Sequence, residues 1–243
     1  VYNPFRVSTE NNGRKIVESQ LIDDNGYYTV DYEDFERKIV ENKIKVFILC
    51  NPHNPVGRVW KREELEKMGE ICLKHDVLII ADEIHSDLIF KEYSHCSFLT
   101  LREELKNICI VCSAPSKTFN LAGLHTSFIF IANPELRAKY KETMMKIRLE
   151  APNIFGIAAV TAAYTKCGEW LDELIEYLDG NRKYIEEYLK ENIPEIKYVK
   201  PEGTYLAWLD FSEFLKDGDT LEDIFEERAK VAIDYGNWFG KIG

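Results

Sequence analysis

Four continuous apolar runs limit the folds open to this chain of 243 residues more than any other feature. They are KVFILC (45–50), VLIIAD (77–82), ICIVCS (108–113) and TSFIFIA (126–132). Strands buried on both faces of a largely parallel sheet have this pattern, whereas half-exposed strands alternate apolar and polar residues. The sequence therefore predicts an α/β fold with a mostly parallel sheet sandwiched by helices.

Amphipathic helices are expected next to these runs. Residues 61–75 lie between the first two runs and place their apolar side chains on one helical stripe. This arrangement is a strand–helix–strand crossover, so we expect strands 45–50 and 77–82 to be parallel. A second amphipathic helix is expected at 31–42.

Beyond residue 134 the pattern is first helical and then mixed. Helices are expected at 134–150, 154–167 and 170–190, followed by short strands at 196–201 and 204–211 and a helix at 220–230. We expect a large α/β domain at 1–155, connecting helices at 156–182 and part of a smaller α/β domain at 183–243. Both ends interrupt a pattern, so the chain is expected to be part of a longer protein.

Charge and cysteine content narrow the class of protein. The 42 acidic and 31 basic residues give a net charge of −11, which argues against nucleic acid or an anionic membrane as partner. No apolar run reaches the length of a membrane span, and the first residues resemble neither a signal nor a transit peptide. The six cysteines, several of them in apolar runs, favour reduced thiols in the cytoplasm. Cys109 and Cys112 form a CxxC within a strand, which favours core packing over a redox or metal site.

Polar side chains follow three of the predicted strands, and ligands of open α/β sheets bind at such strand ends. In NPHNPVGR (51–58), two Asn-Pro pairs and a glycine form a rigid turn that can present the amide of Asn54 to a ligand, or form an Asx turn without one. Asp82 ends an apolar strand, where a carboxylate needs a cation or strong donors. Its candidate partners are a metal, a protonated ring nitrogen or a helix N-terminus. The metal alternative lacks the GxxxxGK[ST] loop that accompanies a Walker B strand.

Lys117 follows the third strand in CSAPSKTFNLAGLH (112–125). A loop lysine is most often a solvated charge. However, Lys117 follows a strand that is expected to be buried, and the small residues around it leave room for a ligand. It is therefore also a candidate to form a Schiff base with an aldehyde. An amine, a buried carboxylate and an amide at strand ends match the needs of pyridoxal 5'-phosphate: an imine, a protonated pyridine nitrogen and a partner for the phenolic oxygen.

Several motifs, in order along the whole chain, carry a family resemblance. They are VYNPF, FILCNPHNPVGRVW, IIADEIHSDLIF, APSKTFNLAGLHTSFIFI, AAYTKCGEWLDELIEYLDGN and PEGTYLAWLDF. With them the chain resembles fold-type I pyridoxal-phosphate enzymes of the aminotransferase class I/II superfamily. Within that superfamily it is most similar to the cystathionine β-lyase-type C–S lyases (the MalY/PatB group).

The resemblance implies a role for each candidate residue. Lys117 would be the Schiff-base lysine and the base that moves the α-proton, Asp82 the partner of the pyridinium nitrogen and Asn54 the partner of the phenolic oxygen. Tyr2 would stack on the pyridine ring, and His85 would lie near the ring oxygen. Hydroxyls near the phosphate would come from Ser116 and, more weakly, from Ser113.

One departure from the family pattern bears on the reaction. Many aminotransferases place a phosphate-binding arginine where this chain has His125, and the lyase group tends to lack it, which favours a lyase. The family's glycine-rich phosphate turn and its carboxylate-binding arginine would lie outside this chain.

The residues and the resemblance leave three functions open. The first is a C–S β-lyase that converts cystathionine or a related cysteine S-conjugate to a thiol, pyruvate and ammonia. The second is an aminotransferase, and the third is a non-catalytic or regulatory protein of this fold. The resemblance also implies an amino-acid substrate and a homodimer.

Overall fold

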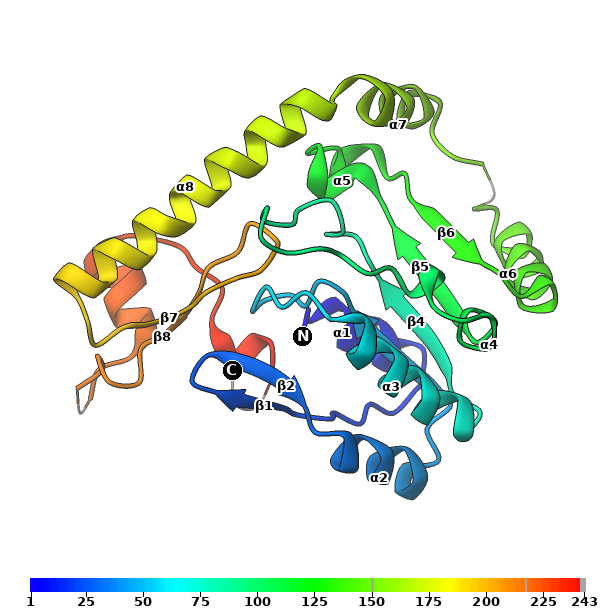
Figure 1. Ribbon diagram of the computed structural model, residues 1–243, viewed down its shortest axis with the longest axis horizontal. Helices are drawn as coiled ribbons and strands as arrows, with labels where there is room; N and C mark the ends of the chain where they lie inside the picture. Colours follow the sequence, from blue (N-terminus) through cyan, green and yellow to red (C-terminus); the bar gives the residue numbers. More distant parts are fainter. Residues whose placement is uncertain (150, 217, 241–243) are drawn as a thin grey trace.

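The computed structural model describes residues 1–149, 151–216 and 218–240. Its centre is a sheet of four strands in the order β3-β4-β5-β6 (Figure 1). The strands are β3 (Val46–Cys50), β4 (Leu78–Asp82), β5 (Cys109–Ser113) and β6 (Phe128–Ile131). β3, β4 and β5 are mutually parallel, whereas β6 runs antiparallel to β5. The predicted strands, the mostly parallel sheet and the parallel pairing of the first two strands are confirmed.

Helices cover one face of this sheet. They are α2 (Tyr32–Asn42), α3 (Arg62–Lys74) and α4 (Glu103–Lys106), and α3 forms the crossover from β3 to β4. Phe35 of α2 and Leu65 of α3 pack with Ile79 of β4 in one apolar core. On the opposite face Ile80 is only half-buried. The apolar runs predict that both faces of the sheet are buried. Within the part of the chain described here, the face covered by these helices is buried and the opposite face is only partly buried.

The N-terminal elements were not predicted. They are α1 (Pro4–Asn11) and a hairpin of β1 (Leu21–Asp24) and β2 (Tyr27–Val30). Asn25 and Gly26 form the hairpin turn, both with positive φ, at 51° and 88°. Asn-Gly is the dipeptide best suited to such a turn, so the sequence did contain the signal for this hairpin.

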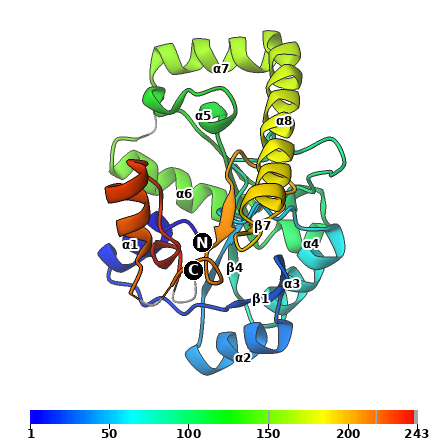
Figure 2. The same cartoon turned by 90° about the vertical axis from the view of Figure 1, so that its left-hand side faces the viewer.

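The C-terminal half is mainly helical. It contains α6 (Pro134–Lys146), α7 (Ile154–Lys166), the long α8 (Gly168–Asn192), and the antiparallel pair β7 (Lys197–Val199) and β8 (Trp208–Asp210). Short helices are η1 (Phe98–Thr100), α5 (Pro115–Thr118), η2 (Ala122–Leu124) and η4 (Gly236–Trp238), and the helix expected at 220–230 is found as a π-helix, η3 (Asp223–Ala229). α7 crosses the end of α8 and α5 lies beneath α7 (Figure 2).

α8 runs through residues 182 and 183 without a break, and the division into 1–155, 156–182 and 183–243 stays a prediction. Within the described residues, no helix combines the length and the apolar character needed to cross a membrane.

Candidate active site

Four of the residues singled out from the sequence line one cavity. The cavity has a volume of about 1160 Å³, and its walls include Tyr2, Asn54, His85 and Lys117. These residues come from the N-terminus, the turn after β3, the segment after β4 and the short helix α5. The structure therefore brings together side chains that are up to 115 positions apart in the chain.

The direction of the strands explains this convergence. Cys50, the last residue of β3, pairs with Asp82, the last residue of β4, and Asp82 pairs in turn with Cys112 near the end of β5. Because the three strands are parallel, their carboxyl ends lie at one edge of the sheet, where ligands of open α/β sheets bind. His85 and Lys117 follow β4 and β5 by a few residues and reach the same edge.

Asp82 is a half-buried carboxylate whose charge is costly in its surroundings. Burial raises the pKa of Asp82 above its ordinary value, and the neighbouring charge of Glu83 acts in the same direction. The backbone N–H of Ile84 donates a hydrogen bond to Oδ1 at 3.1 Å, and this bond and the positive charge of Lys117 partly offset the effect. Asp82 is not among the residues that line the cavity, but it lies close enough to Lys117 to sense its charge.

His85 is a neutral imidazole at neutral pH. Burial lowers its pKa to about 4, and the positive charge of Lys117 adds to the effect. Its ring meets the ring of Tyr205 edge-on, with centroids 5.8 Å apart. Tyr205 also lines the cavity. The sequence did not predict it as a site residue, because the pattern of an aromatic residue after a Pro-Glu-Gly turn does not distinguish packing in a core from contact with a ligand.

Two buried polar atoms at this site have no hydrogen-bond partner among the described residues. They are Oδ1 of Asn54 and Nδ1 of His85. Buried polar atoms in folded proteins nearly always have a partner, so these two atoms of cavity-lining residues are available to a ligand with complementary polar groups. The site thus combines an amine, a carboxylate, a neutral imidazole and an amide around space for a small molecule.

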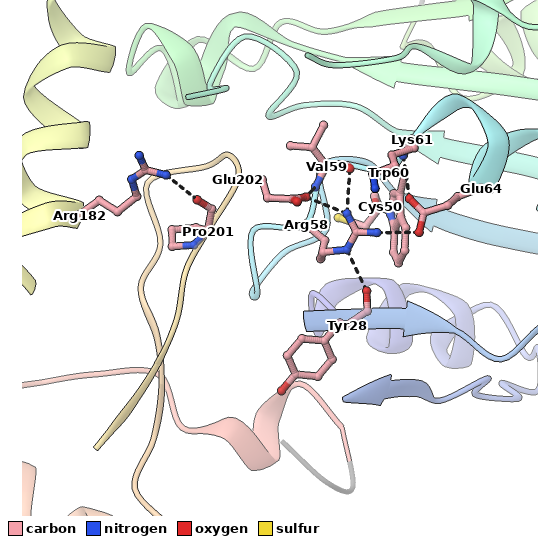
Figure 3. Close-up of polar contacts among 10 residues, drawn as sticks. All are labelled: Tyr28, Cys50, Arg58, Val59, Trp60, Lys61, Glu64, Arg182, Pro201 and Glu202. Atoms are coloured by element: carbon pink, nitrogen blue, oxygen red, sulfur yellow. Dashed lines mark hydrogen bonds and ion pairs between the residues drawn. The ribbon is translucent and has the colours of Figure 1, made fainter. Parts of the chain in front are cut away.

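A buried ion-pair network holds the turn after β3 against the loop that carries Tyr205. Arg58 donates from Nη1 to Glu202 at 2.8 Å, from Nη2 to Glu64 at 2.6 Å and from Nε to the carbonyl of Tyr28 at 2.8 Å (Figure 3). The side chain of Arg58 is only 3% exposed. The network therefore sets the spacing between Asn54, four residues before Arg58, and Tyr205, three residues after Glu202.

The remaining candidates take other positions. Ser113 ends β5 and Ser116 lies on α5 beside Lys117, but neither is among the residues that line the cavity. His125 is exposed and has a left-handed backbone, with φ of 48°. Their roles at a phosphate stay predictions, as does the stacking role of Tyr2, whose ring packs edge-on against Phe5 at 5.6 Å.

Metal and disulfide chemistry find no support in the described part of the chain. No group of three or more His, Cys, Asp or Glu side chains there is arranged to hold a metal ion. Cys109 and Cys112 are free thiols, and burial raises the pKa of Cys112 to about 11. Both cysteines are therefore protonated and unreactive at neutral pH.

The chain is similar to known proteins in sequence and in structure. The family model "Aminotransferase class I and II" matches residues 1–241. Cystathionine beta-lyase PatB of Bacillus subtilis (strain 168) is 42% identical over 243 residues, which are 100% of this chain and 63% of that protein.

The structure of cystalysin from Treponema denticola, which contains a pyridoxal 5'-phosphate cofactor, matches with a TM-score of 0.96 and 39% identity over 100% of this chain and 62% of that chain. The PLP-bound C–S lyase from Staphylococcus hominis matches with a TM-score of 0.91 and 35% identity over 98% of this chain and 60% of that chain. The chain spans less than two thirds of the length of these relatives.

Proposed function

The chain belongs to the aminotransferase class I and II family, and on this premise we propose that the whole protein is a pyridoxal-phosphate-dependent C–S β-lyase. The proposed reaction cleaves cystathionine or a related cysteine S-conjugate to a thiol, pyruvate and ammonia. The observation that carries the proposal is the convergence of Lys117, Asp82 and His85 at one edge of the sheet, beside a cavity with unpaired polar atoms. The lyase names of PatB and of the Staphylococcus hominis enzyme support the choice of reaction.

The residues present fit this cofactor. The unpaired Oδ1 of Asn54 can accept a hydrogen bond from a hydroxyl on its ring, and the unpaired Nδ1 of His85 can donate or accept one, depending on the tautomer. Asp82, whose burial disfavours an isolated charge, gains from a cationic ring nitrogen beside it. When bound, the cofactor supplies an aldehyde that holds amines and a ring that accepts electrons from a carbanion.

The protein's own groups then have distinct tasks. Lys117 would hold the cofactor through its amine, and the same amine, when free, would accept the α-proton of the amino acid. Asp82 keeps a proton on the ring nitrogen because its negative charge favours the cation there. His85 stays neutral at pH 7, so it offers a hydrogen-bonding nitrogen without adding a second positive charge next to Lys117.

An assay of product formation tests the proposal. The full-length protein is incubated with L-cystathionine, and pyruvate and free thiol are measured with and without an added 2-oxoacid. A C–S lyase forms both products without the 2-oxoacid. Amino transfer that requires the 2-oxoacid, with no free thiol, would overturn the lyase in favour of the aminotransferase, the second candidate, which the family name itself supports. A protein that stays colourless with added pyridoxal phosphate would support the non-catalytic alternative.

The assembly and the location belong to the same proposal. The resemblance supports a homodimer, and exposed apolar side chains at the start of α7, Ile154 at 73% and Phe155 at 70%, are consistent with a protein surface that is covered in an assembly. Light scattering of the full-length protein is expected to give twice the mass of one chain. A cytoplasmic location agrees with the six free cysteines.

A further inference from the structure

The helix that carries Lys117 is too short to fix its own position. α5 spans only the four residues Pro115–Thr118, and an isolated helix of this length is not stable in water. The direction of the Lys117 side chain therefore depends on the contacts that hold α5 to its neighbours.

One carboxylate joins α5 to two other segments. Oδ2 of Asp87 accepts a hydrogen bond from Oγ1 of Thr118 at 3.0 Å and another from the hydroxyl of Tyr164 at 3.0 Å. Thr118 is the neighbour of Lys117 and is 1% exposed, while Asp87 lies two residues after His85. The carboxylate thus connects the segment of His85, the helix of Lys117 and α7, which lies above α5 in both views (Figures 1 and 2).

Tyr164 is held in place by aromatic contacts. Its ring meets Phe119 edge-on at 5.4 Å and lies 6.0 Å from the ring of Phe128. Burial, and then the charge of Asp87, raise the pKa of Tyr164, so its hydroxyl stays protonated and donates at neutral pH. Oδ2 of Asp87 thus accepts hydrogen bonds from two hydroxyls, and hydrogen bonds to a carboxylate are stronger than those to a neutral acceptor.

We propose that Asp87 is a positioning residue for Lys117: through Thr118 and Tyr164 it holds α5 so that the Lys117 amine faces the cavity beside His85. This inference deepens the proposed function and rests on it. Asp87 is not among the residues that line the cavity, so it acts through its two hydroxyl partners rather than by touching the substrate.

The rate at which Lys117 captures the cofactor tests this role directly. Full-length protein stripped of cofactor is mixed with pyridoxal phosphate, and the visible absorption that grows as the Lys117 nitrogen bonds to the aldehyde carbon, with loss of water, is followed in time. Asp87→Ala is expected to slow capture about tenfold and to lower kcat about tenfold while KM changes by less than about twofold, because orientation of the amine is lost and substrate contacts are not. Asp87→Asn keeps an acceptor oxygen and is expected to recover part of this loss.

Matched variants separate positioning from general damage. Asp172→Ala removes an exposed carboxylate of α8 and is expected to behave as wild type. If Asp87→Ala is folded and captures the cofactor within twofold of the wild-type rate, the positioning role is wrong. If Asp87→Ala does not fold, Tyr164→Phe decides, since it removes one hydroxyl and is expected to slow capture about threefold; an unchanged rate would overturn the inference.

Lys117→Ala distinguishes a failure of the positioning role of Asp87 from a failure of the proposed function. Loss of capture in Lys117→Ala together with unchanged Asp87 variants refutes only the role of Asp87. Capture at the wild-type rate by Lys117→Ala refutes the proposed function itself.

Discussion

Arg58 and Glu202 are separated by 144 positions in the chain, and they form an ion pair of 2.8 Å in which both side chains are almost fully buried. Oε2 of Glu202 also accepts the backbone N–H of Val59 at 2.7 Å. The pair links the turn that presents Asn54 to the loop that presents Tyr205, so stability and site geometry depend on the same contact.

Breaking this pair from one side is expected to be costly. Glu202→Gln leaves the Arg58 guanidinium buried with half of its charge compensation, and the free energy of unfolding in urea is expected to fall by about 3 kcal/mol or more. The control is Glu41→Gln, which removes a partner of Arg37 at 3.1 Å where both side chains are more than half exposed; a change below about 1 kcal/mol is expected there. Equal losses in the two variants would contradict the assigned importance of the buried pair.

Gly57 is expected to tolerate a side chain poorly. It has φ of +73°, and a Cβ atom would lie 2.5 Å from Cβ of Pro201 and 2.8 Å from the carbonyl oxygen of Gly203. Gly13 offers a matched control, because its φ of +68° is similar and a Cβ there would meet nothing within 4 Å. Gly13→Ala is expected to cost about 1 kcal/mol of unfolding free energy, and Gly57→Ala about 1–3 kcal/mol more because of the close contacts. Similar costs at both positions would show that the loop of Pro201 yields to the added methyl group.

His85 is expected to make the cofactor-free protein sensitive to acid. Its folded-state pKa of about 4 lies below its ordinary value, so between about pH 6.5 and 4 the unfolded chain binds a proton that the folded chain does not. The contribution of His85 to the free energy of unfolding is fully present above pH 6.5. It is lost as the pH falls, by up to about 1.4 kcal/mol per pH unit. His85→Asn removes this contribution, so its unfolding free energy is expected to depend less steeply on pH over this window than that of the wild type. Parallel curves would contradict the neutral, buried imidazole.

Asp82 is expected to oppose stability while it supports activity. Because burial raises its pKa, the folded state favours the protonated acid. The free energy of unfolding therefore falls as the pH rises above the ordinary pKa of an aspartate, where the carboxylate must form in the folded protein. Asp82→Asn is therefore expected to raise the unfolding free energy of the cofactor-free protein at pH 7 and to lower kcat of the lyase reaction by about 10–100-fold. Asp76→Asn is the control: its side chain is 97% exposed and its backbone is left-handed, which asparagine adopts readily, so neither quantity is expected to change measurably. A destabilised Asp82→Asn protein would show that its hydrogen bond and the charge of Lys117 outweigh burial.

Much of the fold could be predicted from the sequence because it depends on local patterns. The four apolar runs became the four strands of the central sheet, and the stripe of residues 61–75 became α3. The hairpin at 21–30 was missed although its Asn-Gly turn was readable. The prediction that both sheet faces are buried was too strong for the described residues. Apolar side chains show that a strand favours burial, but they do not show which element covers each face.

The site divides in the same way. The sequence alone predicts Asn54, Asp82 and Lys117 as site residues, because each is a polar group at or just after the end of an apolar strand and the ends of parallel strands share one edge. The meeting of Asn54 and Lys117 at one cavity near Asp82, the neutral state of His85, the position of Tyr205 and the hydroxyl partners of Asp87 were decided only by the tertiary structure. Contacts between segments 30 to 120 residues apart depend on how every intervening element packs, and burial, which sets the pKa of these groups, exists only in the folded chain.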